Sequence, residues 1–217
     1  MVIPPLDGAK TFVFMGDSIT ADVTAPGSTG NGFRFPLNTA FEADRPSIYP
    51  NTLTLSYVGS VNTGSAPTNN NQGIGGSTAG SMLAFVPTYY GPGKTVVTVD
   101  LVWLLIGINN CDTAAHYQDF FTDYPALITT MKSLTGANRF FVSTIRPVAG
   151  VRYNRAVSIN AELPGIWDAL EAADPALILV RGSENVAGFP LHPLEAQYAT
   201  LSALWYPGMK KLLGYGP

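Results

Sequence analysis

Three polar residues follow directly on a short apolar run near the start of the chain. The run Phe12-Val-Phe-Met15 has the aromatic and β-branched composition of a buried strand, and Gly16 ends it. Asp17, Ser18 and Thr20 come next, and residues of these types favour turns and helix N-caps. Because ligands bind beyond the carboxyl ends of strands in an open α/β sheet, Ser18 is a candidate nucleophile. A plain strand-to-helix turn with Ser18 as its N-cap is the alternative.

Two histidines could supply the base that a weakly nucleophilic serine hydroxyl needs. His192 stands between Leu191 and Pro193, in a loop just before the last helical segment, and is the candidate general base. His116 opens an earlier helical segment, and we interpret it as a surface or capping residue. Asp112 lies four residues before His116, but a single such pair is a poor metal site, so we expect no metal.

Four short motifs in this order resemble the sequence blocks of the SGNH (GDSL-type) hydrolases, a family of serine esterases. They are Gly16-Asp-Ser-Ile19, Gly73-Ile-Gly-Gly-Ser77, Gly107-Ile-Asn-Asn110 and Leu191-His-Pro193. Four blocks in sequence are far more specific than any one of them. Three further stretches look most like the carbohydrate O-acetylesterases of the acetylxylan esterase type: Asn31-Gly-Phe-Arg34, Tyr57-Val-Gly-Ser60 and Asn160-Ala-Glu-Leu-Pro164.

The resemblance implies a role for each block in ester hydrolysis. Ser18 is the nucleophile and His192 the base. Negative charge develops on the ester oxygen and needs donors aimed at it. The resemblance assigns them to the backbone N–H groups of Ser18 and Gly76 and to the side-chain amide of Asn109. Asn110, which replaces the family's usual Asp, is the alternative to Asn109 in this role. Gly76 could instead be an ordinary loop residue, and Asn109 could simply form a turn.

The family usually places an Asp three residues before the histidine, and this chain has Phe189 there. In a Ser-His-Asp triad the carboxylate fixes the imidazole tautomer, and its loss can cost about 10⁴ in rate. A backbone carbonyl of Phe189 or Pro190, or the carboxylate of Glu184 or Glu195, could orient His192 instead. We favour a carbonyl, which needs no long side-chain excursion and makes the pair a Ser-His dyad.

Five apolar segments alternate with helical ones along the chain. The predicted strands are 12–15, 53–58, 96–106, 139–145 and 176–180; the predicted helices are 33–44, from 77 onward, 117–134, 153–173 and 194–213. This alternation predicts a three-layer α/β/α fold with a five-stranded parallel sheet, which the resemblance makes flavodoxin-like. We expect a polar loop over 59–71, a candidate helix break at Pro164, and one domain over 1–217.

Composition excludes several classes of function. Only 12% of the 217 residues are charged, the net charge is −3, and no basic run exceeds Lys210-Lys211, so we expect no nucleic-acid partner. The longest apolar stretch, 95–108, is interrupted by Asp100 and is too short to span a bilayer. No signal peptide is visible, but a secreted form without its leader would look similar, so the compartment stays open. Cys111 is the lone cysteine and does not decide it.

The sequence therefore favours a cofactor-free serine esterase that removes acetyl or similar short acyl groups from a small-molecule or polysaccharide ester. Asn69 to Asn71 and the pair Tyr89-Tyr90 would suit a sugar, although ordinary surface loops have the same composition. Two alternatives remain. One is a lipase or thioesterase of the same fold acting on longer chains, and the other a non-catalytic carbohydrate-binding module. The oligomeric state is not determined by sequence.

Overall fold

The computed structural model describes residues 2–22, 29–148, 150–183 and 191–216. Within these residues seven strands form one sheet, in the order β3-β4-β1-β5-β6-β7, with β2 also paired to β1. The strands are β1 (Ala9–Gly16), β2 (Thr54–Tyr57), β3 (Val61–Asn62), β4 (Asn70–Gly73), β5 (Leu101–Leu105), β6 (Arg139–Thr144) and β7 (Ile178–Ser183). The helices are α1 (Ser18–Ala21), α2 (Arg34–Ile48), α3 (Ala79–Tyr89), α4 (Ala114–Thr135), α5 (Val151–Ala173) and α6 (Glu195–Leu213), with a 3₁₀ turn η1 (Ile108–Cys111).

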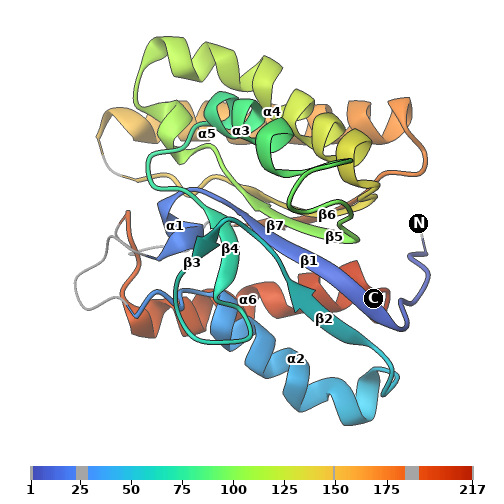
Figure 1. Cartoon of the computed structure of the whole chain (residues 1–217). Coiled ribbons are helices and arrows are strands. Elements are labelled where there is room, and N and C mark those ends of the chain that lie inside the picture. The colour runs from blue at the N-terminus through green and yellow to red at the C-terminus, as the bar shows by residue number, and fades with distance from the viewer. Residues whose placement is uncertain (1, 23–28, 149, 184–190, 217) are drawn as a thin grey trace.

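The five predicted strands pair in parallel, in the order β2-β1-β5-β6-β7. Helices α3, α4 and α5 cover one face, and α2 and α6 cover the other, which confirms the three-layer α/β/α architecture (Figure 1). After β1 the chain adds β2 along one edge of β1 and later adds β5 along the opposite edge, so the strand order reverses between β1 and β5. Such a switch point opens a crevice at the carboxyl ends of the two strands.

The segment 59–71 differs from its prediction as a polar loop, because it contributes two short strands. β3 runs antiparallel to β4, and β4 pairs in parallel with the end of β1, where Gly16 lies opposite Gly73. β2 pairs only with the first half of β1. The polar composition concealed β4, since its buried Gln72 is satisfied by hydrogen bonds with Ser60 at 3.1 and 2.9 Å. The sheet therefore has seven strands where the sequence predicted five.

The helices begin and end close to their predicted bounds. Two other predictions, a break in α5 and the start of the third strand, need correction. α5 continues through Pro164, so the predicted break there is wrong. The third predicted strand begins at Leu101 and not at residue 96. Val96 bonds to the end of α3 instead: its amide donates to the Tyr89 carbonyl at 3.2 Å, and its carbonyl accepts the Gly91 amide at 2.8 Å.

An aromatic cluster anchors α6 on the sheet. The Trp103 ring of β5 stacks on Phe141 of β6 with centroids 3.6 Å apart, and Trp205 of α6 meets Phe33 edge-on at 5.0 Å. The Trp205 indole also donates to the Ser183 carbonyl at the end of β7, at 2.9 Å. Buried aromatic pairs of this kind are worth about 0.5–1.5 kcal/mol beyond their area. The cluster therefore fixes α6 against β5, β6 and the end of β7.

Candidate active site

The turn after β1 brings Ser18 to the carboxyl edge of the sheet. The Asp17 carboxylate accepts the Ile19 amide at 2.9 Å and so caps α1, whose first residue is Ser18. Gly16 is required at the end of β1, because a Cβ there would stand 2.0 Å from the Leu105 carbonyl oxygen of β5. Ser18 is buried to 6% exposure. The tight approach of β1 to β5 thus positions the serine at the switch point.

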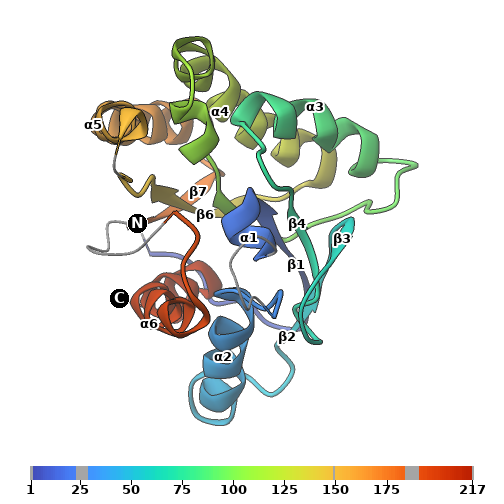
Figure 2. The same ribbon diagram turned by 90° about the vertical axis from the view of Figure 1, so that its left-hand side faces the viewer.

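His192 lies opposite this serine although the two residues are 174 positions apart in the chain. The distance from Ser18 Oγ to His192 Nε2 is 2.9 Å. Figure 2 looks toward this edge, with α1 near the centre and the segment that leads into α6 beside it. When Nε2 carries no proton the hydroxyl donates to it, which is the geometry that general-base activation of a serine needs.

Two adjacent asparagines follow β5 and make different contacts. The Asn109 side-chain amide donates to the Ser77 carbonyl at 3.0 Å, next to Gly76 in the turn before α3. Asn110 accepts the Ala79 amide at 2.9 Å and donates to the His116 carbonyl at 2.9 Å. Both polar ends of Asn110 are therefore used to join α3 to α4. Asn109 still has a second N–H on its amide nitrogen.

Of the four residues predicted to orient His192, Glu195 belongs to the described part of the chain. Glu184, Phe189 and Pro190 lie outside the described residues, so a backbone carbonyl at 189 or 190 stays a prediction. The carboxylate oxygens of Glu195 lie 3.1 and 3.2 Å from the Thr29 hydroxyl, which donates to them.

The electrostatics of the site are set by burial and by two arginines. Burial raises the pKa of Asp17 to about 7, while the charges of Arg146 and Arg152 act against this rise. Burial, followed by the same two arginines, lowers the pKa of His192, and Asp22 opposes that change. This lowered pKa favours the neutral, proton-accepting form of the imidazole.

Sequence reasoning missed Arg146, which follows β6 and is only 3% exposed. Its Nη2 donates to the carbonyl of Leu191 at 2.7 Å, one residue before His192. Asn160 holds the preceding residue, Ile145, by accepting its amide at 2.7 Å and donating to its carbonyl at 2.6 Å. The available signal was an arginine directly after an apolar strand, at the edge where ligands were expected.

Arg34, from the stretch Asn31-Gly-Phe-Arg34, is a second buried arginine beside the site. Its Nε donates to the Thr20 carbonyl at the end of α1 at 2.8 Å, and its guanidinium also bonds the carbonyls of Gly30 and Thr68. Burial lowers its pKa to about 10. Arg34 therefore ties the nucleophile turn to the loop between β3 and β4.

The residues suggested for sugar contact have structural partners instead. Tyr90 is fully buried and donates to Gln72 at 3.2 Å, and Tyr89 donates to the Gly59 carbonyl at 3.0 Å. Asn71 is also fully buried and donates to the Thr63 hydroxyl at 3.0 Å. The interpretation of Asn71 and Tyr90 as a sugar-binding surface is therefore wrong.

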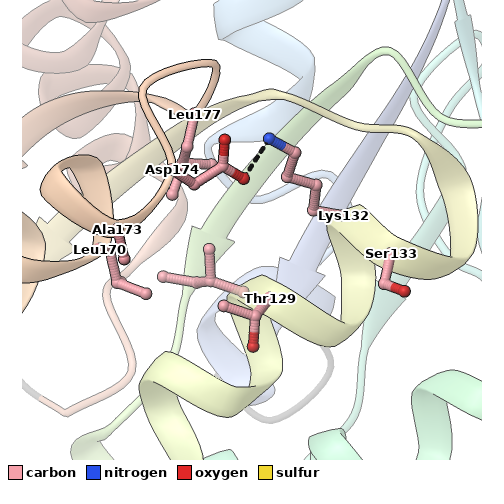
Figure 3. Close-up of a pocket in the computed structure, with 8 residues that line it drawn as sticks. Thr129, Lys132, Ser133, Leu170, Ala173, Asp174 and Leu177 are labelled. Atoms are coloured by element: carbon pink, nitrogen blue, oxygen red, sulfur yellow. Dashed lines mark hydrogen bonds and ion pairs between the residues drawn. The ribbon is translucent and has the colours of Figure 1, made fainter.

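A hollow of about 250 Å³ lies between α4 and α5 (Figure 3). Its lining is mostly apolar, and the ion pair of Lys132 with Asp174 borders it. It sits where α4 and α5 end, next to the amino ends of β6 and β7. Ser18 follows the carboxyl end of β1, so this hollow is separate from the Ser18–His192 pair.

No family model and no curated protein matches the chain in sequence, whereas solved structures match its fold. A family 3 carbohydrate esterase from Clostridium thermocellum superimposes with a TM-score of 0.71 at 21% identity, over 94% of this chain and 97% of that one. A family 3 carbohydrate esterase from Talaromyces cellulolyticus has a TM-score of 0.64 at 15% identity, over 94% of this chain and 98% of that one. An acetyl xylan esterase from Geobacillus stearothermophilus has a TM-score of 0.61 at 16% identity, over 100% of this chain and 99% of that one.

The chain has the fold of these carbohydrate esterases. Two further structures of the Geobacillus esterase are of catalytic mutants, one with a serine and one with a histidine replaced by alanine. In the described part of this chain, no helix is both long and apolar enough to cross a membrane.

Proposed function

We propose that this protein is a serine esterase that removes acetyl or another short acyl group from a carbohydrate. The observation that carries the proposal is the 2.9 Å separation of Ser18 Oγ and His192 Nε2 at the switch point of the sheet. Support comes from the shared fold with esterases of acetylated xylan, and from the serine and histidine whose replacement gave catalytic mutants of one of them.

In the first step Ser18 Oγ attacks the ester carbonyl carbon while its proton passes to His192 Nε2. The tetrahedral oxyanion is stabilised by the backbone N–H groups of Ser18 and Gly76 and by the Asn109 amide. Gly76 has φ +76°, and no atom approaches the position of a Cβ there, so the turn can accept a ligand against its backbone. Collapse of the intermediate breaks the bond to the sugar oxygen, which takes the proton from His192.

In the second step water attacks the acyl-enzyme and gives its proton to His192. The second tetrahedral intermediate expels Ser18 Oγ, which recovers that proton, and the carboxylic acid leaves. A neutral imidazole is needed at the start of each step, and the lowered pKa of His192 favours it. The reaction needs no cofactor.

Hydrolysis of p-nitrophenyl acetate and of acetylated xylo-oligosaccharides tests the proposal. We expect Ser18→Ala and His192→Ala each to lower kcat by roughly 10⁴-fold or more, as removal of a nucleophile or base does in serine hydrolases. His116→Ala removes the other histidine and should leave kcat unchanged. Ester hydrolysis that survives Ser18→Ala would overturn the proposal.

A series of p-nitrophenyl esters tests the acyl group separately. We expect the highest kcat/KM for acetate. A maximum beyond butyrate would indicate a lipase or thioesterase of the same fold, and sugar binding without turnover of any ester would indicate a carbohydrate-binding module.

A further inference from the structure

Arg146 joins the end of β6 to the segment that carries His192. Its Nη2 donates to the Leu191 carbonyl at 2.7 Å, and this carbonyl belongs to the peptide bond that links Leu191 to His192. The backbone of the base is therefore attached to the segment after β6 through the peptide bond next to its own Cα. The attachment point is rigid, because Asn160 holds both backbone polar groups of Ile145.

The chemistry of the side chain limits what Arg146 can do. A guanidinium has N–H donors and no acceptor, so Arg146 cannot take the Nδ1–H of His192 as a triad carboxylate would. A planar guanidinium can, however, hold a carbonyl in a defined place, and a buried charge–dipole hydrogen bond is stronger than a neutral one. Its action on His192 is therefore through the backbone and through its charge.

The charged groups that face His192 come from several elements. Arg146 follows β6, Arg152 lies in the first turn of α5, and Asp22 follows α1. Asp17 of the nucleophile turn is acted on by the same two arginines. The Arg152 guanidinium is paired with Asp112, whereas Arg146 makes the direct bond to the segment of the base.

We propose that Arg146 is a positioning residue of the esterase reaction, which holds His192 opposite Ser18 through the Leu191 carbonyl. The inference rests on the function proposed above. Arg146 fixes the backbone of the base in a site whose sequence lacks the usual acid at position 189. Loss of the bond lets the imidazole move away from the serine hydroxyl, and a misplacement of about 1 Å in a catalytic group can cost 10²-fold in rate.

The same strand offers a matched control. Arg139 begins β6, is 8% exposed, and donates to the Leu212 carbonyl at 3.2 Å. It is thus another buried arginine bonded to a backbone carbonyl, at the opposite end of β6. Arg146→Met and Arg139→Met remove comparable interactions, and thermal unfolding followed by circular dichroism measures the stability lost in each.

We expect Arg146→Met to lower kcat for p-nitrophenyl acetate on the order of 10²-fold with a small change in KM, and Arg139→Met to leave both unchanged at temperatures where each is folded. Arg146→Lys keeps the charge but presents a single ammonium group, so an intermediate kcat is expected. If Arg146→Met does not fold, Arg146→Lys decides, and a kcat equal to that of the parent overturns the proposal.

A second readout does not depend on turnover. In a His116→Gln background His192 is the remaining histidine, and its ring protons can be titrated by NMR. Removal of the Arg146 charge should raise the titration midpoint of His192, while Arg139→Met should leave it in place. An unchanged midpoint in Arg146→Met together with parental kcat would refute the proposal. Failure of the esterase function itself would appear separately, as hydrolysis that survives Ser18→Ala.

Discussion

The side-chain amide of Asn109 donates to the carbonyl oxygen of Ser77 at 3.0 Å and so joins the turn after β5 to the turn before α3. This bond uses one N–H of the amide nitrogen and fixes the plane in which the other lies. Gly76 is the residue before Ser77, so this bond ties the side chain of one predicted oxyanion donor to the residue next to the other. Preorganised donors of this kind act where charge develops in the transition state.

Replacement of Asn109 by alanine removes one of these donors. We expect kcat for p-nitrophenyl acetate to fall by about 10²–10³-fold with little change in KM, as for other oxyanion-hole donors. The free energy of unfolding in urea should fall by about 1–3 kcal/mol, because the buried Ser77 carbonyl loses its partner. Unchanged kcat in a folded variant would remove Asn109 from the proposed oxyanion hole.

Replacement of the neighbouring Asn110 by alanine should lower stability and leave kcat unchanged. The Ala79 amide and the His116 carbonyl would both lose a partner, and a buried unsatisfied polar group costs about 1–3 kcal/mol. Urea unfolding should therefore show a clear loss of stability, while kcat per folded molecule stays close to the parent value. If kcat drops and stability holds, Asn110 and not Asn109 is the donor.

A substitution at Gly76 tests the predicted backbone donor in the turn before α3. Its φ of +76° is strained for any residue with a Cβ, although the Cβ itself would meet no neighbour. Gly76→Ala should cost about 1–2 kcal/mol in stability, the usual penalty of the left-handed conformation, and should lower kcat by displacing the Gly76 N–H.

Gly165, inside α5, is the matched control for this substitution, because a Cβ there also meets open space. Gly165→Ala should stabilise the protein by about 0.5–1 kcal/mol, since alanine is the better helix former. Equal changes in stability and kcat for the two variants would show that the conformation of Gly76 is not special.

Asp17 should make stability depend on pH. Burial raises its pKa from 3.8 to about 7, so between these values the folded protein holds a proton that the unfolded chain releases. Its contribution to the free energy of unfolding therefore falls as pH rises through that window.

Asp17→Asn keeps an oxygen that can accept the Ile19 amide and removes the titration. The difference in free energy of unfolding between variant and parent should thus grow in favour of the variant from about pH 4 to about pH 8. A difference that does not vary with pH would mean that Asp17 is ionised throughout.

The pH profile of kcat/KM should report His192. Only the neutral imidazole can accept the Ser18 proton, and its pKa is lowered from 6.5, mainly by burial. Activity should therefore persist below pH 6.5 and then decline as His192 is protonated. The profile of Asp17→Asn separates this step from the titration of Asp17, and an acid limb above 6.5 in both proteins would contradict the assignment.

The sequence was enough to predict the strand and turn around Ser18, the alternation of strands with helices, and the order of the motifs, because these depend on local periodicity and turn chemistry. It could not reveal β4, whose polar side chains are buried by hydrogen bonds rather than by apolar packing. It left Asn109 and Asn110 as competitors, since adjacent residues of one type differ only in their partners. The motifs implied that Ser18 and His192 meet, but the 2.9 Å distance between them and the bond from Arg146 to Leu191 could come only from the folded structure, because each joins segments whose separation in space is set by the packing of the whole sheet and its helices.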